Sequence, residues 1–221
     1  MCGRFAFYSP LDATAELFGV ENNLDVRARY NIAPTQDVVA VKVNMVDETE
    51  LVTFRWGLVP SWAKGSGGGS RLINARSETV AEKPSFRDAY QQRRCVIFAD
   101  GYYEWKTEGG FKTPFFISAA DGRPFGFAGL WESWRSPDSD RNLQTATIIT
   151  APANTFLSRL HHRMPVSVEP ENAQRWLLGG VSVLGEIIAK PLRFCAWPVD
   201  HRIGNPRNDR PDLIEPKGAL I

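Results

Sequence analysis

Cysteine and histidine are both scarce in this sequence, which has three of each among its 221 residues. The cysteines, Cys2, Cys95 and Cys195, are too far apart to form a zinc motif, and their odd number argues against a disulfide framework. Cys95 and Cys195 stand in apolar runs, where a cysteine usually behaves as a small buried hydrophobic residue. We therefore expect neither a metal site nor a cofactor.

Long hydrophobic runs and a strong net charge are missing as well. No stretch approaches the roughly 18 to 20 uncharged apolar residues that span a bilayer, and the N-terminal segment lacks a secretory pattern. We therefore expect a soluble cytoplasmic protein without membrane contact. The formal net charge is +1, so an anionic ligand has to meet a local cluster of cations instead of a general positive field.

Short segments rich in β-branched and aromatic residues recur along the chain, bounded by Gly, Pro or Asp. They predict strands over residues 38–46, 50–56, 94–98, 102–106, 114–118, 125–130, 145–150 and 194–199. Helical spacing is rarer and predicts short helices over residues 12–18, 84–92, 170–178 and 181–189. The pattern favours an α+β fold in which residues 1–221 form one domain, a curved, mostly antiparallel sheet or open β-barrel flanked by short helices. Polar or glycine-rich residues predict flexible loops near 65–70 and 136–142.

The most informative residue is Cys2, whose side chain is small enough for the initiator methionine to be removed. Removal would leave an α-amine with a pKa of roughly 7.7 to 8.0 and a thiol with a pKa of about 8.5 on one residue. The amine can condense with an aldehyde to an imine, and the sulfur can then close a five-membered thiazolidine ring. If Met1 stays in place, the amine is an amide and this chemistry is blocked. The alternative is that Cys2 is simply a small residue after the start codon.

Three polar residues are candidates for assisting such chemistry. Glu104 lies in an aromatic run, where desolvation would raise the pKa of its carboxyl group and let it carry a proton. His161 precedes a second histidine, and an inward-facing ring could exchange a proton near neutral pH. Asn74 follows an apolar pair and could hold a substrate oxygen or the terminal amine. The alternatives are that Glu104 lies on the solvent-exposed face of an edge strand, that His161 is a structural residue and that Asn74 satisfies only local backbone groups.

Aromatic residues also stand next to cations at several places. Arg4 precedes Phe5, and Trp105 precedes Lys106. Cations that follow phosphates and rings that stack on bases are typical of a groove for single-stranded nucleic acid. Arginines dispersed over an ordinary surface are the alternative.

Six short motifs occur in order along the chain: MCGRF at 1–5, YNIAP at 30–34, WGLVP at 56–60, INARSET at 73–79, FADGYYEW at 98–105 and HHRMP at 161–165. Together they resemble the SOS-response-associated peptidase (SRAP) family. The resemblance extends from residue 2 to about residue 208 and so covers nearly the whole chain. Any one motif is a weak signal, but the six in order, with a cysteine at position 2, are specific.

The resemblance implies a sensor and shield of abasic sites in single-stranded DNA, whose ring-opened sugar is an aldehyde. By this resemblance Cys2 forms a stable thiazolidine cross-link after loss of Met1, and Asn74 positions the amino terminus and the sugar. Glu104 assists proton transfers and ring opening. His161 takes part in Schiff-base chemistry, in strand cleavage as an abasic-site lyase and in reversal of the cross-link. The implied partners are single-stranded DNA that contains abasic sites and junctions between single- and double-stranded DNA.

The same resemblance assigns residues to DNA binding and implies a place at damaged DNA on the nucleoid. The cations grip phosphates, the tryptophans stack on or wedge between bases, and a threonine lies near the site; they are Arg4, Arg76, Arg163, Trp62, Trp105 and Thr150. We expect a monomer, because no heptad array or long apolar patch suggests obligate assembly.

Two other functions compete with this interpretation. One is a thiol peptidase or autoprotease, in which Cys2 is the nucleophile and its own amine, Glu104 or His161 is the helper. The other is a module that binds single-stranded or damaged DNA without any covalent step. The nearly neutral charge slightly disfavours a general DNA binder, which usually carries a clear positive excess.

Overall fold

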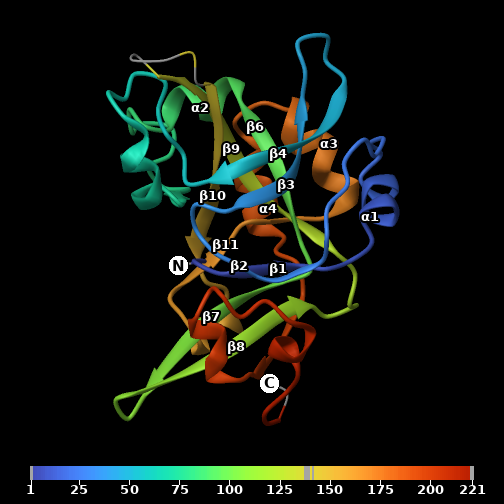
Figure 1. Cartoon of the computed structure of the whole chain (residues 1–221), viewed down its shortest axis with the longest axis vertical. Helices are drawn as coiled ribbons and strands as arrows, with labels where there is room; N and C mark the ends of the chain where they lie inside the picture. Colours follow the sequence, from blue (N-terminus) through green and yellow to red (C-terminus); the bar gives the residue numbers. More distant parts are fainter. Residues whose placement is uncertain (1, 137–139, 141, 220–221) are drawn as a thin grey trace.

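The computed structural model describes residues 2–136, 140 and 142–219, and within these the strands form two β-sheets (Figure 1). The larger sheet has eight strands in this part of the chain: β3 (Asp37–Val43), β4 (Thr49–Trp56), β5 (Asn74–Arg76), β6 (Arg94–Ala99), β9 (Phe125–Arg135), β10 (Asn142–Pro152), β11 (Arg163–Pro165) and β12 (Ser167–Val168). The smaller sheet has five: β1 (Phe5–Phe7), β2 (Arg29–Ile32), β7 (Gly101–Glu108), β8 (Phe111–Ala119) and β13 (Phe194–Pro198).

Five strands of the larger sheet close into a barrel. Neighbours in the order β4–β3–β6–β9–β10 are antiparallel, and β10 then meets β4 as a parallel neighbour, with Thr145 opposite Arg55 and Ala146 opposite Trp56. Trp56 and Phe127 are fully buried, as expected for a small barrel that side chains fill. The predicted α+β fold with a mostly antiparallel, curved sheet is confirmed, and the barrel is closed instead of open.

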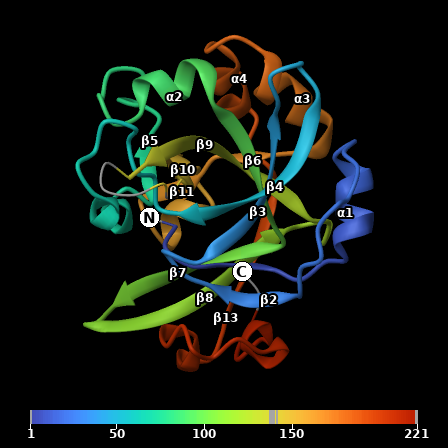
Figure 2. The same ribbon diagram turned by 45° about the horizontal axis from the view of Figure 1, so that its top comes forward.

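The smaller sheet runs in the order β13–β8–β7–β1–β2 and buries both of its faces. Phe5 and Tyr102 belong to the main core, whereas their neighbours Ala6 and Tyr103 belong to a second, smaller cluster. The alternation follows from the period of two along a strand. The second cluster includes residues of the C-terminal segment, which folds over this face with two 3-10 helices, η3 (His201–Gly204) and η4 (Pro211–Ile214) (Figure 2).

Four short helices surround the barrel, as the sequence predicts: α1 (Leu11–Leu17), α2 (Arg87–Gln92), α3 (Pro170–Leu178) and α4 (Val183–Ala189). α2 begins later than expected because residues 84–86 form a turn, in which the carbonyl of Lys83 accepts hydrogen bonds from the N–H groups of Phe86 and Arg87. In the described part of the chain, none of the helices has both the length and the apolar character needed to cross a bilayer.

Several elements are absent from the sequence-based prediction because they are very short. β1, β2, β5, β11 and β12 contain two to four residues each, too few to show a period. Part of the predicted loop near 65–70 forms a 3-10 helix, η1 (Ser66–Arg71), in which Gly69 is buried. The predicted loop at 136–142 lies largely outside the described residues.

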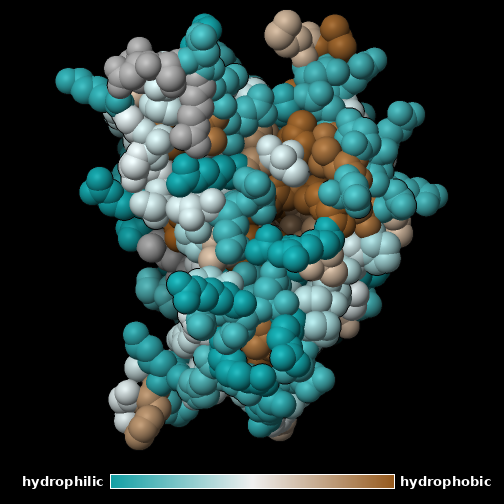
Figure 3. Space-filling model, in the orientation of Figure 1, coloured by the Kyte–Doolittle hydropathy of each residue, from teal (hydrophilic) through white to brown (hydrophobic). Residues whose placement is uncertain are grey.

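Figure 3 shows that the face presented in Figure 1 is mostly hydrophilic, with apolar side chains gathered over β3. A hollow of about 170 Å³ opens there, lined mainly by apolar residues that include Phe7, Val26, Ile32, Val38 and Val39. The N-terminus lies elsewhere, at the junction of the two sheets (Figure 1).

Candidate functional site

The N-terminal segment places Cys2 between the two sheets. β1 and β7 are antiparallel with Phe5 opposite Tyr102, so the residues before Phe5 lie beside the residues after Tyr102. The backbone N–H of Tyr103 donates to the carbonyl oxygen of Arg4 at 2.9 Å, which continues this pairing toward the terminus. Cys2 is fully buried, and its carbonyl oxygen accepts a hydrogen bond of 2.7 Å from Nδ2 of Asn74. Two independent contacts therefore fix the backbone around the cysteine.

Glu104 lies on β7 and is a buried carboxylate, with 4% of its surface exposed. β7 is flanked by β1 and β8, and Glu104 shares the face of Tyr102, which packs into the main core. This excludes the alternative that Glu104 lies on the solvent-exposed face of an edge strand. Burial raises the pKa of the Cys2 thiol strongly, and the negative charge of Glu104 raises it further. The carboxylate and the sulfur are thus electrostatically coupled.

Asn74 is positioned by the parallel pairing of β5 with β10, in which it stands opposite Ile148. The indole N–H of Trp56 donates to the carbonyl of Ile73 at 3.0 Å and so holds the residue just before it. While Nδ2 of Asn74 binds Cys2, its Oδ1 is buried without a hydrogen-bond partner in the described chain. A buried acceptor of this kind is costly unless a ligand or another group supplies a donor.

His161 follows the 3-10 helix η2 (Leu157–Arg159) and reaches the same place from the opposite side. Its Nδ1 lies 4.0 Å from Oε1 of Glu104 and accepts a hydrogen bond of 3.0 Å from the backbone N–H of Arg163. The same Nδ1 lies 3.1 Å from the carbonyl oxygen of Arg163, so the tautomer of the ring decides which of the two backbone groups it binds. The adjacent His162 is exposed, and the positive charge of His161 lowers its pKa. The structure therefore brings together Cys2, Asn74, Glu104 and His161.

Thr150 and Arg163 adjoin this group but are committed to other partners. Arg163 pairs through both terminal nitrogens with Glu78, and its Nη2 also donates to the carbonyl oxygen and Oγ1 of Thr150 at 2.7 and 3.2 Å. The hydrogen bonds from Arg163 lower the pKa of Glu78 to about 2. Thr150 is fully buried. A phosphate would have to compete with the carboxylate of Glu78 for Arg163.

The two other arginines assigned to phosphates have different surroundings. Arg76 is exposed, and its side chain makes no hydrogen bond or ion pair within the described residues. Arg4 is half-buried, and its Nη1 donates to Oδ1 of Asn31 at 2.8 Å and to the carbonyl of Ile203 at 3.0 Å. No local sequence pattern indicates a partner for Arg4, because Asn31 and Ile203 are distant from it in the chain.

The two tryptophans assigned to base stacking also differ. Trp62 lies in the loop after β4 with 65% of its surface exposed, so its ring is available to a ligand. Trp105 is half-buried and packs against the second cluster, on the face of β7 opposite to Glu104. Phe111, at the tip of the β7–β8 hairpin, is an exposed ring that sequence reasoning did not single out. Among the described residues, no group of acidic, histidine or cysteine side chains has the arrangement of a metal site.

The fold and the site together define a small α+β barrel protein with a buried cysteine at position 2, faced by an amide, a carboxylate and an imidazole. The family model described as SOS response associated peptidase (SRAP) matches residues 1–206. The chain therefore belongs to the SRAP family.

Two relatives and one solved structure illustrate the similarity. The chain is 40% identical over 229 residues to the abasic site processing protein YoaM of Bacillus subtilis, with 100% of both chains covered. It is 34% identical over 230 residues to the abasic site processing protein YedK of Escherichia coli, covering 98% of this chain and 100% of that one. A crystal structure of a protein from Bacteroides thetaiotaomicron, 24% identical, has the same fold, with a TM-score of 0.86 over 97% of this chain and 99% of that one.

Proposed function

We propose that this protein processes abasic sites in single-stranded DNA by forming a covalent bond through Cys2 once Met1 has been removed. The observation that carries the proposal is the convergence of Asn74, Glu104 and His161 on a cysteine whose amine becomes the chain terminus. The names of the relatives support abasic sites as the target. The nucleophile and its helpers all come from this chain, so the reaction requires no cofactor.

The first step is attack of the Cys2 amine on the C1′ aldehyde of the ring-opened sugar. The carbinolamine that forms loses water to give an imine. Glu104, buried beside the cysteine, is placed to accept the proton from the amine and to return one to the departing hydroxyl group. Asn74 already holds the Cys2 carbonyl, and its unpaired Oδ1 offers an acceptor for an amine hydrogen.

The second step is addition of the Cys2 sulfur to the imine carbon. The thiol proton passes to the imine nitrogen, a C–S bond forms, and the product is a thiazolidine; the overall reaction releases one water. Closing a five-membered ring within one residue avoids the entropy cost of bringing two molecules together. The raised pKa keeps the thiol protonated until the imine has formed, which favours attack by the amine first. His161, whose Nδ1 lies 4.0 Å from Oε1 of Glu104, can exchange protons with this carboxylate through one water molecule during imine hydrolysis, strand cleavage or reversal.

Recognition of the strand depends on cations and rings around this site. Arg76 and Trp62 have exposed side chains, and we propose that they contact a phosphate and a base. An abasic nucleotide in paired DNA would have to be unstacked before its sugar could reach a buried cysteine. We therefore expect single-stranded DNA and junctions to react faster than fully paired abasic DNA, and equal rates on both would contradict this preference.

Intact mass spectrometry before and after mixing with an abasic single-stranded oligonucleotide tests the proposal. The expected result is a protein that lacks Met1 and gains the mass of the DNA minus one water in a heat-stable adduct. Cys2→Ala should form no such adduct, and an oligonucleotide with a tetrahydrofuran residue, which has no aldehyde, should not react. A heat-stable adduct from Cys2→Ala would overturn the proposal, whereas a labile imine through its α-amine would not. Peptide hydrolysis without an adduct would indicate the peptidase instead.

A further inference from the structure

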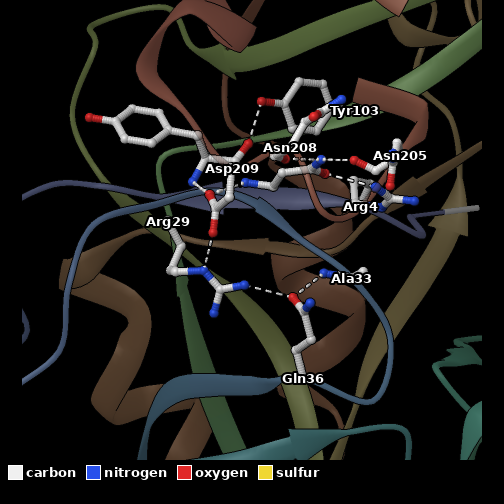
Figure 4. Close-up of polar contacts among 10 residues, drawn as sticks. Arg4, Arg29, Ala33, Gln36, Tyr103, Asn205, Asn208 and Asp209 are labelled. Carbon is white, nitrogen blue, oxygen red and sulfur yellow. Dashed lines mark hydrogen bonds and ion pairs between the residues drawn. The ribbon is translucent and has the colours of Figure 1, made fainter. Parts of the chain in front are cut away.

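Asn31, in the motif at residues 30–34, has no part in the chemistry described above but occupies the centre of a polar network. It lies on β2 and is fully buried, although its side chain is an amide. Figure 4 shows that the network joins the N-terminal strand, β2 and the C-terminal segment. A buried amide of this kind persists only where its hydrogen bonds are satisfied.

Both ends of the Asn31 amide are used. Oδ1 accepts a hydrogen bond of 2.8 Å from Nη1 of Arg4. Nδ2 faces three carbonyl oxygens of the C-terminal segment, those of Ile203, Asn205 and Asn208, at 3.3, 3.1 and 2.6 Å. Figure 4 shows the contacts with Asn205 and Asn208. The amide orientation follows from these partners, since a guanidinium needs an acceptor and carbonyls need donors.

The chemistry of the position suits asparagine specifically. Aspartate would keep the acceptor for Arg4 but would place a negative oxygen against three carbonyls. Leucine would leave those carbonyls and Nη1 of Arg4 without their partner, and glutamine is one methylene longer. The residue thus combines an acceptor for a cation with donors for backbone carbonyls in one rigid plane.

Arg4 is held in this way by neutral groups only. Nη1 donates to Asn31 and to the carbonyl of Ile203, Nε is buried without a partner, and Nη2 makes no hydrogen bond within the described chain. No carboxylate among the described residues pairs with Arg4, whereas Glu78 pairs with Arg163. No carboxylate of the described chain therefore neutralises the positive charge, and Nη2 remains as a charged donor for a phosphate.

We propose that Asn31 is a positioning residue that acts through Arg4, fixing the guanidinium so that its Nη2 group meets a phosphate of the bound strand. The inference rests on the proposed function, because the strand is the DNA that carries the abasic site. Asn31 itself touches no DNA.

Substitution of Asn31 should weaken DNA binding but leave the rate of the covalent step nearly unchanged. The backbone at Cys2 and Arg4 is held by Asn74 and by the N–H of Tyr103, which do not depend on Asn31. Losing Asn31 therefore releases the guanidinium but leaves the sulfur in place. The Kd for DNA reports the first effect, and the cross-linking rate at saturating DNA reports the second.

The experiment measures equilibrium binding by fluorescence anisotropy, in a Cys2→Ala background, to a single-stranded oligonucleotide with one tetrahydrofuran residue. Asn31→Ala should raise Kd about tenfold, and Arg4→Ala should raise it by a similar factor. The double variant should bind no more weakly than Arg4→Ala, because both changes remove one interaction. In protein with Cys2 intact, Asn31→Ala should leave the cross-linking rate at saturating DNA within about threefold of wild type.

Asp209→Asn is the matched control. The Asp209 carboxylate accepts hydrogen bonds from the backbone N–H groups of Tyr30 and Asn31, so its loss loosens the same network without contacting Arg4. It should lower the melting temperature with little change in Kd. If Asn31→Ala folds poorly, Arg4→Lys serves instead, since it keeps the charge but lacks the planar fork, and it should also raise Kd.

Three results would overturn the inference. Asn31→Ala that lowers the melting temperature but not the affinity would make the residue purely structural. An unchanged Kd and salt dependence in Arg4→Ala would show that Arg4 holds no phosphate, even if cross-linking proceeds normally. Failure of the Cys2→Ala parent to bind this DNA at all would overturn the inference, whereas the proposed function would fall only if the wild type formed no heat-stable adduct.

Discussion

The two polar clusters on either side of the N-terminal strand differ in whether the chain satisfies their hydrogen bonds. In the network around Asn31, both ends of the amide and both oxygens of Asp209 have partners. Around Cys2, the Oδ1 of Asn74 is buried without one. The amide of Asn31 and the carboxylate of Asp209 are thus saturated by the chain, and in their network only Arg4 keeps unused donors, whereas the cluster around Cys2 retains an acceptor beside the reacting residue. Substitution of Asp209 should therefore cost stability, substitution of Asn31 or Arg4 should cost DNA affinity, and substitutions around Cys2 should cost reaction rate.

Glu104→Gln should show the largest effect, and it should be an effect on rate. The amide keeps the size of the side chain but cannot accept a proton, so the single-turnover cross-linking rate should fall about 100-fold or more. Removing a buried negative charge also lowers the pKa of the Cys2 thiol, since the charge of Glu104 raises it. The residual reaction should accordingly extend to lower pH.

Thermal unfolding of the same variant is the necessary companion measurement. The melting temperature should change little, because the amide keeps the volume of the buried side chain. A loss of stability with an unchanged cross-linking rate would instead place Glu104 among the residues that only complete the fold.

Gly69→Ala should show the next largest effect, on stability. A Cβ at Gly69 would lie 2.6 Å from the carbonyl oxygen of Gly57, and that segment leads through η1 to Asn74. We expect a loss of about 1 to 3 kcal/mol in the free energy of unfolding, measured by denaturant titration. Gly67→Ala is the control, because its Cβ would meet nothing within 4 Å. Equal losses of unfolding free energy in the two variants would show that contact with Gly57 does not cause the effect at Gly69.

The two tryptophans, Trp62 and Trp105, allow a DNA-binding role and a structural role to be compared with the same substitution. Trp62→Ala removes an exposed ring and should weaken binding to single-stranded DNA by about 1 to 3 kcal/mol, the usual value of one stacked base, with the melting temperature unchanged. Trp105→Ala removes a ring that packs against the second cluster and should lower the melting temperature. Anisotropy titrations and thermal unfolding of both variants measure this contrast. The reverse pattern would assign base stacking to Trp105.

The sequence predicted the fold class and singled out residues that the structure brings together at Cys2, but it did not predict their surroundings. Strands and helices of six or more residues show their period, whereas β5, which carries Asn74, is three residues long and is set by pairing with β10. Closure of the barrel depends on the pairing of β4 with β10, which no local pattern reveals. The partners of Arg4 and Arg163 likewise come from distant segments. A motif can identify a cation, but only the tertiary structure shows whether a carboxylate already neutralises it.

The smallest effect should come from Glu78→Gln, which tests whether the ion pair with Glu78 holds and neutralises Arg163. The hydrogen bonds from Arg163 lower the pKa of Glu78 to about 2 from its ordinary 4.5. The carboxylate therefore stabilises the folded state above about pH 4.5, and this contribution disappears as the pH falls toward 2.

Because Glu78 is largely solvent-exposed, we expect Glu78→Gln to cost only about 1 kcal/mol at pH 7 and nothing near pH 2, measured by denaturant titration across this range. Glu82→Gln, at an exposed carboxylate without a side-chain partner in the described chain, should show no such window. A Glu78→Gln cost that did not change with pH would mean that packing, and not the ion pair, holds Arg163. In that case the guanidinium would be free to bind phosphate, and the distinction drawn between Arg4 and Arg163 would not hold.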